Sequence, residues 1–167
     1  MIISAILLPF IIQTIVIFID EYYFHIKRGL PRWERIGHPL DTLSVLLCLL
    51  FVLFVPYSMD ALKAYLALAI FSCLFVTKDE FVHKHHCPAS EQWLHSLLFL
   101  NHPIVLTSLG IIWLIIEEAK SPAWVAHLDH SPLLHPFLIT QTVFITLFLL
   151  YQIIYWNFIW KEKKVIG

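Results

Sequence analysis

Five apolar stretches, each close to the length of a membrane-crossing helix, constrain this chain of 167 residues more than any other feature. A helix needs roughly 20 predominantly apolar residues to cross the hydrocarbon layer of a bilayer. The stretches cover residues 2–19, 40–55, 61–77, 103–116 and 136–160. A sixth apolar segment, residues 92–100, is half a span and predicts a short interfacial or re-entrant helix. We therefore expect an all-α integral membrane bundle of about five transmembrane helices, with residues 1–167 forming a single transmembrane domain.

The composition supports this class and excludes others. Hydrophobic residues make up 59% of the chain, charged residues make up 14%, and the mean hydropathy is +0.78. A soluble domain usually carries about 25% charged residues, so this chain has too little polar surface to face water on all sides. Its net charge of −1 also argues against a nucleic-acid partner, because phosphate binding needs an excess of basic side chains.

The basic residues predict how the spans are oriented. Nine of the 11 lysines and arginines fall in the first and third links between spans and in the C-terminal tail. They are Lys27, Arg28, Arg32, Arg35, Lys78, Lys84, Lys161, Lys163 and Lys164. Because basic residues collect on the cytoplasmic side, the N-terminus is predicted outside and the C-terminus in the cytoplasm. The first span has its positive charges after it, which indicates a retained helix rather than a signal peptide.

Two polar segments repeat the same order of residues after the first and third spans. Each has Asp-Glu, then a histidine within five residues, then Pro-x-x-Glu-x-x-x-His, over residues 20–38 and 79–95. The pattern indicates an internal repeat of residues 1–58 and 59–118, as two helical hairpins, followed by a fifth helix over 136–160. Both His38 and His102 precede a proline, so the partner of His38 in the repeat is either His95 or His102.

The repeated segments carry the candidate metal ligands. Glutamate and histidine three or four residues apart lie on the same face of a helix, and Glu-x-x-His is a ligand pair of di-iron helical bundles. The candidates are Glu21, His25, Glu34, His38, Glu80, His83, Glu91, His95 and His102. Asp20 and Asp79 are expected to orient a ligating histidine. One such pair is more often a helix cap or an ion pair, but four pairs at one membrane face favour metal binding.

Mixed nitrogen and oxygen donors suit iron, manganese or zinc, and this number of ligands is enough for two ions. We expect two iron ions, with manganese or zinc as the alternatives. Three histidines, His127, His130 and His135, lie across the bilayer and read as part of a solvated loop. The three cysteines offer no disulfide framework, and Cys87 reads as an inert thiol.

This layout of a few spans with cytoplasmic histidine clusters resembles the integral-membrane di-iron hydroxylases and desaturases, over residues 20–103. The resemblance implies O₂-dependent oxidation of a lipid-like chain, with electrons from a protein partner. The sequence His83-Lys84-His85-His86 is one residue short of that superfamily's His-x-x-His-His box, and no His-x-x-x-His box is present. The larger share of carboxylates is similar to ferritin-type and alternative-oxidase-type di-iron sites.

Three functions of different class fit the pattern. The first is a di-iron oxidoreductase of the hydroxylase or desaturase type that acts on a lipid-like substrate at the cytoplasmic face. The second is a zinc-dependent membrane hydrolase that cleaves a lipid amide or ester. The third is metal or proton transport, or haem binding. Transport is disfavoured because the ionisable groups gather at one end of the spans, and haem does not account for the carboxylates.

Overall fold

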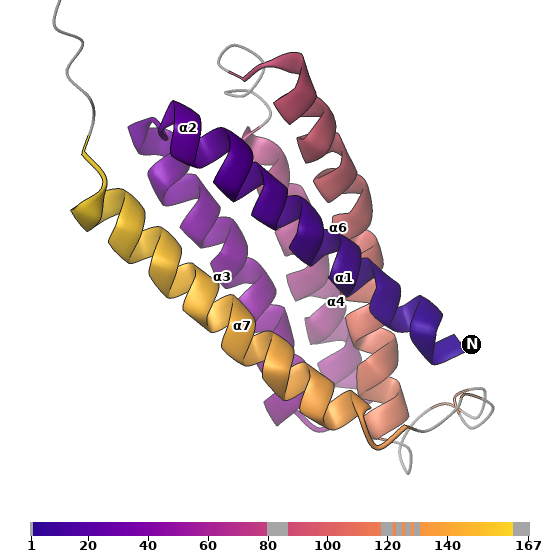
Figure 1. Ribbon diagram of the computed structural model, residues 1–167. Coiled ribbons are helices and arrows are strands. Elements are labelled where there is room, and N and C mark those ends of the chain that lie inside the picture. The colour runs from indigo at the N-terminus through magenta and orange to yellow at the C-terminus, as the bar shows by residue number, and fades with distance from the viewer. Residues whose placement is uncertain are drawn as a thin grey trace, which may run out of the picture.

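The computed structural model describes residues 2–79, 87–117, 122, 125, 128 and 131–161, and these form a helical bundle (Figure 1). Its elements are α1 (Ile2–Ile19), the π-helix η1 (Asp20–His25), α2 (Ile26–Arg28), α3 (Arg32–Phe54), α4 (Met59–Phe75), the 3-10 helix η2 (Val76–Asp79), α6 (Ala89–Ile116), α7 (Leu134–Ile154) and the π-helix η5 (Tyr155–Ile159). The described residues contain no strand. Five helical segments are long and apolar enough to cross a membrane, which confirms the predicted fold class.

Helix α6 forms the centre of the bundle. Leu109, Ile112 and Trp113 on this helix are almost completely buried. Trp113 Nε1 donates to the Val55 carbonyl over 3.0 Å, and Tyr65 Oη donates to the Leu106 carbonyl over 2.6 Å. A polar group without a hydrogen bond is costly in an apolar interior, so these bonds satisfy the donors that the large aromatic side chains bring inside.

The surface along the helices is apolar and the interior is partly polar. Phe54, Leu74, Leu100 and Phe158 are each between 68% and 77% exposed. By contrast, six aspartate, glutamate and histidine side chains of the helical segments α1–α2 and α6 are buried. They are Asp20, Glu21, His25, Glu91, His95 and His102. Ionisable residues of membrane helices face the bundle interior in this way, so the arrangement is that of a multi-pass membrane protein.

Two helix boundaries differ from the prediction. Residues 92–100 do not form a separate half-span, because α6 runs without a break from Ala89 to Ile116 and contains Pro103. Likewise α3 begins at Arg32 rather than near residue 40, and it contains Pro39. Proline is tolerated inside membrane helices because neighbouring groups satisfy the carbonyl that it frees. Glu34 and His38, and likewise Glu91 and His95, therefore lie on the same helices as the spans that follow them.

A short link between α2 and α3 closes one end of the bundle. Gly29 has a φ of +79°, a conformation that glycine adopts at little cost, and its N–H donates to the His25 carbonyl over 2.8 Å. A side chain at this position would collide with the ring of Trp160. The end of α2, the starts of α3 and α6 and the end of α7 lie at this same end of the bundle (Figure 1).

Candidate metal centre

The π-helical turn of residues 20–25 builds the first half of the site. In a π-helix the backbone hydrogen bond spans five residues, which widens the turn, and such turns often occur at functional sites. Here the wider turn brings both acidic side chains to the same histidine. Asp20 Oδ2 lies 3.2 Å from His25 Nε2, and Glu21 Oε2 lies 3.0 Å from His25 Nδ1. The two nitrogens of one imidazole therefore face two different carboxylates.

The first turns of α6 supply the second half. Glu91 Oε1 lies 3.6 Å from His25 Nε2, and His95 Nε2 lies 3.0 Å from Asp20 Oδ1. One donor atom from each of Asp20, His25, Glu91 and His95 lies within 4.8 Å of the others, and all four side chains are buried. His25 Nε2 makes no hydrogen bond within the described part of the chain. We call these four residues the donor cluster, and its donors are the nitrogens and oxygens that transition metals bind.

A second group of donors adjoins the first at the same histidine. It consists of His25, Glu34 and His38, and the rings of His25 and His38 are 4.8 Å apart at their centroids. Because His25 Nδ1 is bonded to Glu21, only its Nε2 is available to a metal ion. One nitrogen cannot ligate two ions, so His25 can serve only one of the two groups at a time.

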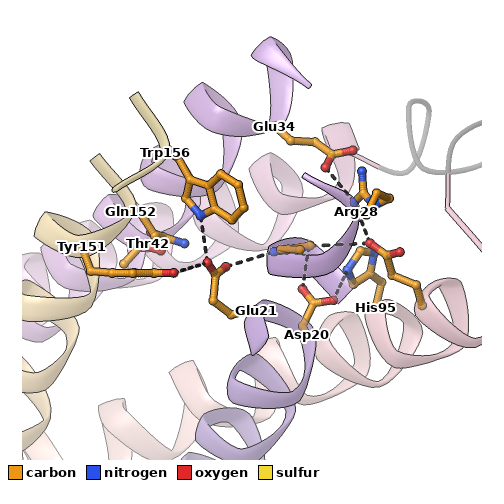
Figure 2. A network of polar contacts seen from close by, with 11 residues as sticks. Asp20, Glu21, Arg28, Glu34, Thr42, His95, Tyr151, Gln152 and Trp156 are labelled. Atoms are coloured by element: carbon orange, nitrogen blue, oxygen red, sulfur yellow. Dashed lines mark hydrogen bonds and ion pairs between the residues drawn. The ribbon is translucent and has the colours of Figure 1, made fainter. Parts of the chain in front are cut away.

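Arg28 joins the two groups from the side. The Arg28 Nη2 atom lies 2.7 Å from Glu91 Oε1 and 2.9 Å from Glu34 Oε2. Both glutamate side chains are fully buried, whereas the arginine side chain is 22% exposed. Figure 2 shows Arg28 between Glu34 and the donor cluster. This guanidinium therefore supplies a fixed positive charge between two carboxylates.

Glu21 anchors the cluster to α7 and lies outside both groups of donors. Its Oε1 accepts hydrogen bonds from Tyr151 Oη and from Trp156 Nε1, each over 2.8 Å, while its Oε2 faces His25 (Figure 2). A carboxylate that bonds the second nitrogen of a ligating histidine fixes its tautomer and orientation. The sequence suggests that Asp20 orients a histidine and that Glu21 is a ligand. In the structure Glu21 holds the orienting position at His25, and Asp20 lies in the donor cluster.

The sequence predicts three further ligands, Glu80, His83 and His102. Glu80 and His83 fall outside the described residues, as do His85 and His86. His102 is buried on α6 but belongs to neither donor group, and its Nε2 lies 3.0 Å from Ser72 Oγ.

Cys87 lies beside the donor cluster, and His135 lies far from it. Burial raises the pKa of the Cys87 thiol to about 12, which keeps it protonated at neutral pH and agrees with its reading as an inert thiol. His135 is exposed on the first turn of α7, at the far end of the bundle, whereas His127 and His130 are outside the described part of the chain.

A cavity of about 140 Å³ adjoins the donor cluster. The polar end of its wall is formed by Asp20, Glu21, His25, His38 and His95. The apolar end is formed mainly by Ile17, Val45, Phe99, Ile145 and Phe148, from the helices α1, α3, α6 and α7. An apolar space with a few convergent polar groups at one end is the usual form of a small-molecule site.

No protein-family model, curated protein or solved structure in the comparisons matches this chain. The chemistry of the site therefore has to be argued from its own geometry.

Proposed function

We propose that this protein is a metal-dependent membrane oxidoreductase that acts on an apolar, lipid-like substrate. The observation that carries the proposal is the donor cluster itself, a buried set of two carboxylates and two imidazoles at the polar end of an apolar cavity. The same geometry supplies a place for the metal ion and a place for the substrate beside it.

The charges around the cluster favour a bound cation. Four buried acids, Asp20, Glu21, Glu34 and Glu91, lie in and beside the cluster, and one arginine, Arg28, pairs with Glu34 and Glu91. Burying carboxylates away from water is costly unless positive charge compensates them. In addition, the Nδ1–H of His25 donates to Glu21, so the Nε2 lone pair of the neutral ring points at carboxylate oxygens. A divalent ion between these atoms removes that repulsion, and a second proton on the ring is the competing explanation.

The donor types favour iron over zinc. Asp20, His25 and His95 form a set of two histidines and one carboxylate, which is the ligand set of many non-haem iron oxygenases. With Glu91 as a fourth ligand, these residues would hold an iron or manganese ion, and that ion would supply O₂ activation. A tetrahedral zinc ion with four protein ligands is closed, as in structural zinc sites.

A second ion, as expected for a di-iron enzyme, would need its own donors. Glu34 and His38 are close enough to contribute, and Glu80 and His83 are further candidates from the sequence. We therefore assign the first ion to the donor cluster and propose that any second ion binds on the Glu34 side.

The proposed reaction inserts one oxygen atom of O₂ into a C–H bond of the substrate and reduces the other to water. Two electrons and two protons balance this step, and we propose that an electron-donor protein supplies the electrons at the cytoplasmic face. The residues of this chain would hold the metal, keep the reacting carbon at the polar end of the cavity and exclude bulk water from it. Glu21 would keep His25 oriented through Nδ1.

A zinc-dependent lipid hydrolase is the second candidate, because two imidazoles and two carboxylates also suit zinc. Such an enzyme needs an open zinc position for water, so either Asp20 or Glu91 would have to leave the metal. The two candidates therefore differ in the metal that the purified protein holds.

Metal quantitation tests both. We expect protein purified in detergent from metal-replete cells to hold iron or manganese, at one or two ions per chain. Glu91→Gln removes a ligand without changing its shape and should reduce the metal content at least about tenfold. Glu117→Gln, the same change at the other end of α6, is the matched control and should retain the metal. One zinc per chain would favour the hydrolase, and wild-type protein without metal would overturn the proposal.

A further inference from the structure

We infer that the cavity takes a lipid with a single hydrocarbon chain and no anionic head group, with the chain along the bundle and its polar or reactive end at the donor cluster. This inference rests on the proposed function for the identity of the reactive end. The shape of the cavity and the charge of its walls carry the rest.

A second cavity adjoins the first towards the middle of the bundle and shares part of its wall. This smaller space, of about 40 Å³, ends among Phe10, Leu49 and Leu109. The walls shared by the two spaces are Gln13, Ile17, Val45, Ile145 and Phe148. Along α6 the lining extends from His95 to Leu109, which corresponds to about 21 Å at the rise of an α-helix.

The two spaces together are long and narrow. An engineered protein cavity of about 150 Å³ holds one benzene molecule, so the larger space has room for roughly six carbon atoms. A fused multi-ring molecule or a lipid with two chains is larger than such a space. A single chain of medium length fits it along the helix direction.

Two glutamines in the wall accept hydrogen bonds from neighbouring side chains. Thr42 Oγ1 donates to Gln152 Oε1 over 2.7 Å, and Asn101 Nδ2 donates to Gln13 Oε1 over 2.9 Å. Because these two carbonyl oxygens already have donors, a hydrocarbon chain can lie beside them without leaving them unsatisfied.

The charge at the polar end selects against an anionic head group. The four acids near the cluster outnumber Arg28, and the formal charge remains negative even with one divalent ion bound. The adjacent Asp41 is already paired with Lys78. In a low-dielectric site a substrate carboxylate would be repelled by these groups, whereas a hydroxyl, carbonyl or terminal methyl group would not.

Photolabelling tests the inference on the intact protein in detergent. The probes are an eight-carbon alcohol and the matched eight-carbon carboxylic acid, each with a photoreactive diazirine near the chain end. We expect the alcohol to label residues 10–17 and 141–148, as located by mass spectrometry, and the acid at pH 8 to label them at least about fivefold less. Equal labelling by the two probes would overturn the assignment of head-group charge.

A pair of variants on α3 tests the location. Val45→Phe fills the junction of the two spaces and should reduce labelling by the alcohol at least about fivefold. Leu47→Phe makes a change of similar kind on the exposed face of the same helix and should leave labelling unchanged. Undiminished labelling in Val45→Phe would overturn the inference. Metal content is measured on the same preparations, so specific labelling of a metal-free wild type would refute the proposed function and leave the chain-binding cavity standing.

Discussion

Helix α6 carries two buried polar groups that differ in how their atoms are satisfied. Glu91 and His95, on its first turns, belong to the donor cluster. His102, two turns further on, ends a chain of hydrogen bonds through Ser72 Oγ to Ser44 Oγ, with distances of 3.0 and 2.7 Å. We call this second group the serine–histidine chain. The two groups differ in whether each buried polar atom has a hydrogen-bonding partner.

Each link of the serine–histidine chain pairs a donor with an acceptor. The Ser44 hydroxyl donates to the Asp41 carbonyl, so its oxygen accepts the Ser72 proton, and Ser72 Oγ in turn accepts from an N–H at His102 Nε2. Every proton has a place and no charge is needed. In the donor cluster, by contrast, His25 Nε2 faces oxygens of Asp20 and Glu91 without a hydrogen bond, although His95 and Arg28 each donate to one of these carboxylates. The excess of buried acidic groups is therefore in the donor cluster, where a bound cation or a second proton on His25 would offset it, and not in the serine–histidine chain.

The largest effect is expected when the same substitution is made in each of the two groups and the metal content is compared. His25→Gln should reduce the metal content to background, because it removes the nitrogen at the centre of the donor cluster. His102→Gln should retain the wild-type metal content, because the amide can still donate to Ser72. Elemental analysis of the monodisperse fraction from size-exclusion chromatography measures both.

Circular dichroism on the same fractions controls for folding. If His25→Gln remains helical and keeps its metal, the donor cluster is not the metal site. If His102→Gln loses metal while it stays folded, the serine–histidine chain is not merely structural.

The second largest effect is expected at Arg28. Arg28→Met leaves the buried carboxylates of Glu34 and Glu91 without their guanidinium, and breaking a buried ion pair in this way costs about 3–5 kcal/mol. We expect the metal-free variant to be destabilised by that amount in denaturant unfolding. Added Mn²⁺ should then stabilise the variant more than the wild type, because a divalent ion can replace the lost positive charge.

Lys63→Met provides the control for this experiment. Lys63 pairs with Asp60 at the surface, where both side chains are largely exposed, so its removal should change the stability little. An Arg28→Met variant as stable as the wild type, with no added response to Mn²⁺, would show that Arg28 does not compensate the cluster.

The sequence predicted the helices and the end of the bundle where the polar residues gather, because apolar length and the i, i+4 pattern are local signals. It did not predict that α6 is continuous, since the polar residues Asn101 and His102 before Pro103 looked like a boundary. Whether His102 joins the cluster is decided by tertiary contact. Ser72, on another helix, holds its Nε2.

The exchange of roles between Asp20 and Glu21 has a related cause. An i, i+4 spacing makes Glu21 the natural partner of His25, and the two side chains are indeed hydrogen-bonded. The π-helical turn, however, brings Asp20 to the other ring nitrogen, and no periodic pattern in the sequence announces such a turn. Glu21 also accepts hydrogen bonds from Tyr151 and Trp156, which lie near the other end of the sequence. No local sequence pattern predicts these bonds either.

The smallest effect is expected for a substitution in the serine–histidine chain. Ser72→Ala leaves the His102 Nε2–H without an acceptor and Ser44 Oγ without a donor. Side-chain hydrogen bonds between membrane helices contribute about 0.6 kcal/mol on average, and up to about 1.7 kcal/mol. Because both partners of Ser72 are buried, we expect a loss of stability in the upper part of that range, with unchanged metal content.

A double-mutant cycle with Ser44→Ala separates the hydrogen bond from the packing. If the three groups form one chain, the second substitution should cost less in the Ser72→Ala background than in the wild type, because the Ser44–Ser72 bond is already lost. Additive losses would show that the two hydroxyls are not coupled. A fall in metal content in Ser72→Ala would show instead that the chain supports the donor cluster through α6, and the two groups would then have to be treated as one site.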